Sequence, residues 1–212
     1  MQQYDDFEKM DFASNYLSKN PIIRFVHSRF FAKLSASIAD ISSTPRTVLE
    51  VGGGEGFSTA VLRRCFPEKT IFISSDLILE LVKRNKGRSG IRNLLAQDIS
   101  RLAVKSRSVD LVIALEVLEH LSHPESAVRE LARVTRTWAI LSVPFEPWWR
   151  IGNLLRGSYW NEWGNTPDHR NHWGKGSFSR LLSLEFSSVR VLVSFPWLIA
   201  VCKDSRRKER AT

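Results

Sequence analysis

Acidic side chains recur where short apolar runs of the chain end. Glu50 and Glu55 flank a run of glycines, and Asp76 and Asp98 close the two apolar runs that follow. We expect these four carboxylates to line one pocket, with no Lys or Arg among them. Such a lining suits a positively charged ligand and disfavours a pyrophosphate.

The glycines between the first two acids predict a cofactor loop. Residues 48–51 read as a short buried strand, the glycines allow a sharp turn and close approach to a ligand, and apolar residues resume at helical spacing. A dinucleotide fingerprint G-x-G-x-x-G would need glycine at Phe57 or Thr59, and no Gly-Lys-Ser/Thr closes a P-loop. The pattern that remains is E-x-G-x-G-x-G, formed by Glu50, Gly52, Gly54 and Gly56.

This pattern resembles the first motif of the class I S-adenosylmethionine-dependent methyltransferases, and the resemblance continues for most of the chain. S-adenosylmethionine carries a sulfonium and an ammonium group but no phosphate, which fits the acidic lining. An acid ending the second strand, Asp76, can accept hydrogen bonds from both ribose hydroxyls. The resemblance implies that Asp98 faces the adenine amino group and that Ile99 packs on the ring. The predicted cofactor residues are Glu50, Gly52, Gly53, Gly54, Gly56, Asp76, Leu77, Asp98, Ile99 and Glu116.

From residue 46 onward, strand and helix patterns alternate, which predicts a parallel sheet with right-handed crossovers. The fold class is therefore α/β, a doubly wound Rossmann-like sheet. The resemblance implies seven strands in the order 3-2-1-4-5-7-6 with the last strand antiparallel. Helices are expected at 57–65, 77–86, 124–135 and, capped by Ser177, 178–185; strands are expected at 48–51, 70–74, 93–96, 109–114, 138–143, 189–195 and 197–202.

The 212 residues are expected to form a single methyltransferase domain. Its expected parts are a helical cap over the cofactor edge (1–44), the cofactor-binding core (45–143), a substrate lid (144–176), a closing helix and strands (177–203) and a basic tail (204–212). Cys65 and Cys202 have neither disulfide nor metal spacing, and neither a signal peptide nor a transmembrane segment is predicted. These features favour a cytoplasmic protein; the sequence indicates no oligomeric state.

The lid holds five of the seven tryptophans. Tryptophans at the carboxyl edge of a sheet can wall a pocket for a flat or apolar acceptor, or they can pack the lid against the sheet. His120 and His172 are the candidate general bases for an acceptor that must lose a proton, with His169 a third.

The motif E-x-x-E-H, formed by Glu116, Glu119 and His120, would place three side chains on one helical face. In the resembling family, some O-methyltransferases use such a cluster, with a lid histidine matched here by His172, to hold a divalent cation that polarises a hydroxyl. Capping and ordinary hydrogen-bonded packing explain the same residues, and we prefer that interpretation.

The formal net charge of +9 raises nucleic acid as a partner, but the cations are spread over expected helix faces and the tail. We therefore expect methyl transfer to an oxygen or nitrogen nucleophile of a small-molecule acceptor. Such catalysis depends mainly on aligning acceptor and methyl group. The alternatives are a nucleic-acid methyltransferase and a cofactor-binding protein without turnover.

Overall fold

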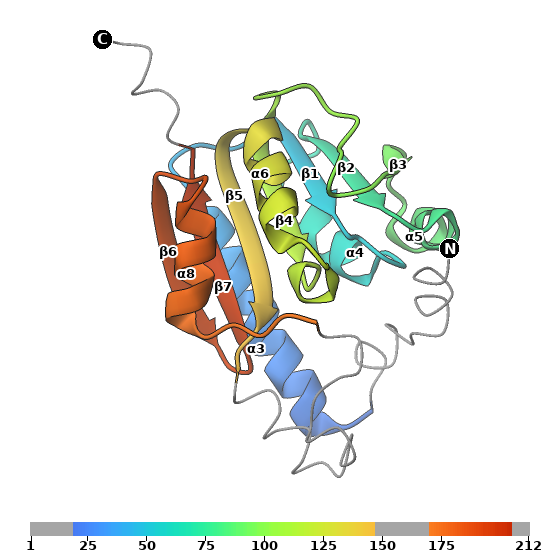
Figure 1. Ribbon diagram of the computed structural model, residues 1–212. Coiled ribbons are helices and arrows are strands. Elements are labelled where there is room, and N and C mark those ends of the chain that lie inside the picture. Colours follow the sequence, from blue (N-terminus) through green and yellow to red (C-terminus); the bar gives the residue numbers. More distant parts are fainter. Residues whose placement is uncertain (1–18, 147–169, 205–212) are drawn as a thin grey trace.

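The computed structural model describes residues 19–146 and 170–204. Its centre is a seven-stranded sheet in the order β3-β2-β1-β4-β5-β7-β6 (Figure 1). Strand pairs are parallel from β3 to β5, whereas β7 is antiparallel to both β5 and β6. The strands are β1 Thr47–Val51, β2 Ile71–Asp76, β3 Leu94–Ala96, β4 Val109–Leu115, β5 Thr135–Pro144, β6 Ser188–Ser194 and β7 Trp197–Lys203. The predicted fold class and strand order are confirmed.

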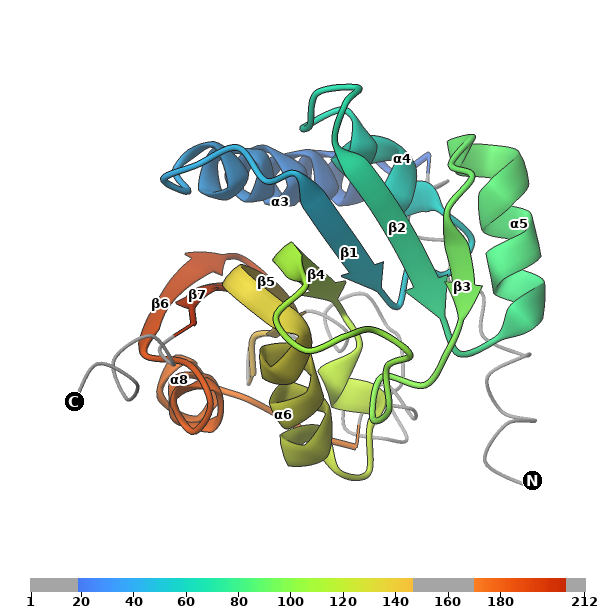
Figure 2. The same ribbon diagram turned by 90° about the horizontal axis from the view of Figure 1, so that it is seen from above.

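Helices cover both faces of this sheet. Figure 2 shows α3 and α4 above one face and α6 and α8 below the other, with α5 beside β3. The central strand β4 is buried almost throughout, as expected for a parallel strand covered on both sides. The helices are α3 Pro21–Ala39, α4 Phe57–Arg63, α5 Leu79–Ser89, α6 Pro124–Val134 and α8 Lys175–Ser183.

Helix α3 begins where the sequence places a start signal. The Asn20 side chain caps the helix by accepting a hydrogen bond from the Ile22 amide. Proline follows directly, because the first helical residue needs no amide hydrogen for a bond within the helix. Phe30, Leu34 and other residues of the helix pack on one face of the sheet. In Figure 1 the N-terminal half of α3 runs past the arrowhead of β5, so it reaches the carboxyl edge.

Several predicted boundaries move. Helix α8 starts at Lys175 after Gly174, so Ser177 lies within the first turn and not before the helix; its hydroxyl accepts from the Gly174 amide at 3.0 Å, as in a capping box. Strand β5 starts at Thr135, because the chain passes from α6 directly into the strand. Most of the predicted lid (147–169), the first 18 residues and the tail from 205 lie outside the described residues. No helix in the described part of the chain is both long enough and apolar enough to span a bilayer.

Candidate functional site

The glycine loop follows β1 at the carboxyl edge. Gly52, Gly54 and Gly56 have φ angles of 79°, 51° and 89°, in a backbone region that residues other than glycine rarely adopt. The amides of Gly52 and Gly53 both donate to the Ser75 carbonyl at 2.8 and 2.9 Å, which fixes the loop to β2. A Cβ on Gly52 would lie 2.3 Å from Val117, whereas one on Gly54 would meet no atom within 4 Å. The loop is therefore enclosed at one glycine and open at the other.

Glu50 supports this loop from beneath. It is buried, and its carboxylate accepts from Ser58 at 2.7 Å, from Ser74 at 2.8 Å and from Thr59. Burial raises the pKa of Glu50, and the three hydroxyl donors oppose that shift. Glu50 thus faces the interior between β2 and α4, so it positions the loop and does not line an open pocket.

Asn85 belongs to the same buried network, and sequence reasoning missed it. Its side-chain amide donates to Thr59 at 2.9 Å and to Ser74 at 3.2 Å. A Cβ on Gly56 would lie 2.6 Å from the Asn85 side-chain oxygen, so the loop packs directly on α5. The available signal was its spacing, three residues after the buried Val82 on one helical face.

Asp76 lies at the carboxyl end of β2, as predicted, beside the open glycine. Its carboxylate accepts from the Gly54 amide at 2.9 Å and from the Ile78 amide at 3.0 Å. Burial raises its pKa, and these backbone donors lower it. The next residue, Leu77, exposes its side chain. The structure therefore brings Asp76, Leu77 and Gly54 together.

The two residues predicted to contact adenine lie beyond β3 in different environments. Asp98 is exposed and accepts from the amide and the hydroxyl of Ser100 at 2.8 and 2.6 Å. Ile99 is buried with Leu102 in the core on the α6 side of the sheet. Their contacts with a base stay a prediction.

Glu55 corrects the prediction of a lining without arginine. Its carboxylate forms ion pairs with Arg84 at 3.0 Å and with Arg88 at 2.9 Å, both from α5. The hydrogen bond from Arg88 is the main cause that lowers the pKa of Glu55. Spacing along the chain could not show this, because α5 returns beside the loop only in the folded sheet.

Glu116 is placed by a backbone turn and not by a helix. Its φ is 56°, and only a short 3-10 turn, Leu118–His120, follows. The prediction that E-x-x-E-H forms one helical face is therefore wrong. The Glu116 carboxyl instead faces two distant strands, where it accepts from Ser142 at 3.0 Å and from the Trp197 indole at 2.6 Å. Burial raises its pKa to about 8.

Glu119 is fully buried, and neither of its carboxyl oxygens has a hydrogen-bond partner among the described residues. Burial, followed by the proximity of Glu116, raises its pKa well above the ordinary range. His172 pairs with a different acid, since its Nδ1 lies 3.3 Å from Glu146 Oε1. Within residues 19–146 and 170–204, no three His, Cys, Asp or Glu side chains converge to hold a metal ion. The four suggested ligands Glu116, Glu119, His120 and His172 are therefore not gathered into a metal centre.

The end of the predicted lid is anchored over the same edge. The amides of Arg170 and Asn171 donate to the Glu119 carbonyl at 2.8 and 3.1 Å. The Glu146 amide donates to the carbonyl of Trp173, which is itself buried. The segment carrying His172 thus lies across the turn that carries Glu119.

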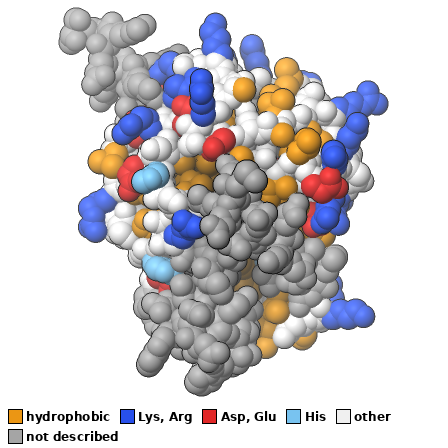
Figure 3. All heavy atoms as spheres, turned by 45° about the vertical axis from the view of Figure 1, so that its right-hand side comes forward, with side chains coloured by type: hydrophobic (Ala, Val, Ile, Leu, Met, Phe, Trp, Pro, Cys, Tyr) orange, Lys and Arg blue, Asp and Glu red, His pale blue; other side chains and the backbone are white. Residues whose placement is uncertain are grey.

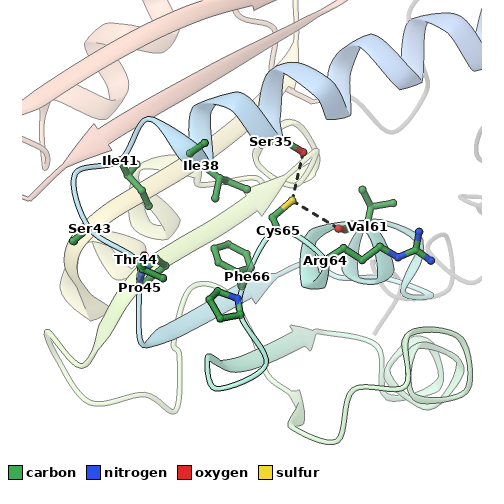
Figure 4. Close-up of a pocket in the computed structure, with 12 residues that line it drawn as sticks. Ser35, Ile38, Ile41, Ser43, Thr44, Pro45, Val61, Arg64, Cys65 and Phe66 are labelled. Carbon is green, nitrogen blue, oxygen red and sulfur yellow. Dashed lines mark hydrogen bonds between the residues drawn. The ribbon is translucent and has the colours of Figure 1, made fainter.

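A cavity of about 570 Å³ lies elsewhere, between the C-terminal ends of α3 and α4 (Figure 4). Ile38, Phe66 and Arg64 line it, and Cys65 lies 3.4 Å from the Ser35 hydroxyl. Because α3 ends and β1 begins there, the cavity belongs to the amino edge of the sheet. It is separate from the glycine loop.

Comparison with known sequences shows what the central part of the chain, residues 49–143, is similar to. Residues 49–143 match the family model of a methyltransferase domain. A Mycobacterium tuberculosis protein described as a probable S-adenosylmethionine-dependent methyltransferase is 34% identical over 47% of this chain and 35% of its own length. The malonyl-[acyl-carrier protein] O-methyltransferase of Legionella pneumophila is 26% identical over 58% of this chain and 42% of its own length. The chain thus spans less than half the length of these curated relatives.

The fold also matches solved structures. Magnesium protoporphyrin IX methyltransferase from Synechocystis, with bound SAH, superimposes with a TM-score of 0.68 and 17% identity over 96% of each chain. A carbon methyltransferase, CurJ, gives a TM-score of 0.69 and 15% identity over 91% of this chain and 57% of that one. At such identities the likeness concerns the fold.

Proposed function

We propose that this chain, whose residues 49–143 match the methyltransferase-domain family model, is a class I S-adenosylmethionine-dependent methyltransferase that transfers a methyl group to an oxygen or nitrogen nucleophile of a small-molecule acceptor. The observation that carries the proposal is the glycine loop. Gly54 opens into space within hydrogen-bond distance of Asp76, while Gly52 and Gly56 are closed by packing. A ligand is thereby admitted at one position beside a carboxylate.

The residues at this loop fit the cofactor. Asp76 would accept hydrogen bonds from the ribose hydroxyls, and its bond from the Gly54 amide already orients it. Glu50 holds the loop in place through its three hydroxyl donors. When bound, S-adenosylmethionine supplies a methyl group activated by its positively charged sulfur. S-adenosylmethionine has no phosphate to be neutralised, which agrees with the carboxylate of Asp76 accepting a hydrogen bond from the Gly54 amide at 2.9 Å.

The acceptor side would lie around Glu116, Glu119 and His172, at the same edge. Glu116 directly follows β4, and the lid segment carrying His172 crosses the turn of Glu119. The Nδ1 atom of His172 lies 3.3 Å from Glu146 Oε1, so an imidazole that accepts a proton from the acceptor would form an ion pair with this carboxylate. His120 is the second candidate base. Alignment of the acceptor supplies most of the acceleration in such a transfer, so these groups act mainly by orientation and by excluding water.

The face shown in Figure 3 gives no specific support to nucleic-acid methylation. In the face shown in Figure 3, Lys and Arg side chains are scattered and separated by other surface, and they form no continuous stripe. Nucleic-acid binding modules concentrate their positive charge along the path of the backbone.

Two measurements test the proposal. Titration calorimetry is expected to show binding of S-adenosylmethionine and its demethylated product but not of NAD, because the loop departs from the dinucleotide pattern. A transfer assay with labelled methyl donor against metabolite and RNA pools then reports the acceptor. Label in RNA alone would replace the small-molecule proposal. Binding of S-adenosylmethionine without methyl transfer to any pool would favour a cofactor-binding protein without turnover. Binding of NAD alone would refute the assignment of S-adenosylmethionine as the cofactor.

A further inference from the structure

Helix α3 exposes large apolar side chains at its N-terminal end. Ile22 is 70% exposed and Phe25 is 60% exposed, although the rest of the helix packs on the sheet. Phe195, in the turn between β6 and β7, is 56% exposed. This turn adjoins the helix, because the Trp197 ring lies 5.0 Å from His27. Three large apolar side chains are thus presented at one end of the molecule.

The charges of the same helix all have one sign. Residues 21–39 contain Arg24, Arg29 and Lys33 and no acid. Arg24 and Arg29 are exposed, and the Arg29 guanidinium lies 5.7 Å from the centre of the Phe25 ring. Ile22, Phe25 and Arg29 follow one helical line, at spacings of three and four residues. We call Ile22, Arg24, Phe25, Arg29 and Phe195 the α3 patch.

We propose that the α3 patch docks the protein on the surface of an anionic lipid bilayer. Exposed Ile and Phe side chains can enter the boundary between headgroups and acyl chains, while neighbouring arginines pair with lipid phosphates. RNA would use the arginines but would leave Ile22 and Phe25 in water. The charge of the chain, +9, complements the negative surface potential of such a bilayer.

The position of the patch gives docking a consequence for the proposed function. His27 and Phe30 of α3 contact Trp197, and the Trp197 indole donates to Glu116. The α3 patch and the proposed acceptor side therefore share the carboxyl end of the sheet. If methyl transfer occurs there, docking would bring an amphiphilic acceptor to it. Binding to lipid itself does not depend on methyl transfer.

The test is co-sedimentation of the full chain with vesicles of phosphatidylcholine, with or without phosphatidylserine. We expect binding only to the anionic vesicles, weakened by salt. Arg24→Gln and Arg29→Gln should each lower the partition coefficient about fivefold, the effect of one cation near such a surface. Phe25→Ser should lower it at least as much, because its apolar contact is lost. Leu184→Ser and Lys86→Gln remove matched exposed side chains from outside the patch and should leave binding unchanged.

Circular dichroism confirms that each variant is folded. Equal binding to both vesicle types, or no binding to either, would overturn the proposal. Binding that survives all three patch variants would move the contact to another surface, which also overturns it. Competition by RNA that depends on Arg29, in a protein whose vesicle binding does not depend on Phe25, would assign the patch to nucleic acid.

Discussion

Glu116→Gln is expected to stabilise the protein at neutral pH and to reduce the loss of stability between pH 5 and 8, while the buried Glu119 keeps its own contribution to that loss. Burial raises the pKa of Glu116 from 4.5 to about 8. The folded protein therefore holds a proton at Glu116 that the unfolded chain releases in this window. Stability from this group is complete below the unfolded pKa and is lost as pH rises toward the folded one.

The magnitude follows from the same two values. A rise of the Glu116 pKa from 4.5 to about 8 lowers the free energy of unfolding by at most ~5 kcal/mol across the window, and ~3 kcal/mol of this is already lost at pH 7. Glutamine keeps the geometry, because its oxygen can accept from Trp197 and its amide can donate to Ser142. The variant carries no titrating proton at position 116, so its free energy of unfolding should exceed that of the parent by up to ~3 kcal/mol at pH 7 and by little near pH 4.5.

Urea denaturation followed by circular dichroism, repeated at intervals from pH 5 to 8.5 without cofactor, measures this difference. Glu55→Gln is the matched control, because ion pairs with Arg84 and Arg88 lower the pKa of Glu55. That variant should lose stability at pH 7, by less than ~1 kcal/mol for a pair near the surface. Parallel stability curves for the parent and Glu116→Gln would refute the reasoning, since they would mean that Glu116 has no raised pKa.

Three further predictions concern the glycine loop and the lid. Gly54→Val should abolish binding of S-adenosylmethionine in calorimetry, because a side chain would fill the opening at a φ of 51°. Gly90→Ala is the control: Gly90 has a φ of 70° and similar open space, so this variant should only lose about 1–2 kcal/mol of stability through backbone strain. Asp76→Ala should weaken binding by about 1.5–3 kcal/mol through lost charge-assisted hydrogen bonds, and parental affinity in a folded variant would remove Asp76 from the site. His172→Ala should leave cofactor affinity unchanged and lower methyl transfer by about 10- to 100-fold; full activity would place acceptor orientation elsewhere.

The order of elements could be predicted because it depends on local patterns. Residues 109–115 form a nearly continuous apolar run, as expected of a central parallel strand. The glycines after residue 51 indicate a sharp turn by themselves, because glycine readily adopts positive φ. Asp76 was assigned to the carboxyl end of a strand for the same reason. The predicted strand order came from a family resemblance and was confirmed.

The environment of each acid was decided only by the tertiary structure. Glu55 was expected in a cationic-ligand pocket, but α5 brings two arginines to it. Glu116 was expected on a helical face, but a positive φ directs it to Trp197, 81 residues away. The sequence by itself determined which segments become strands, helices and the glycine turn, because those depend on residues near in the chain. Which carboxyl groups are buried, paired or left without a partner depends on contacts between distant strands, which no local pattern contains.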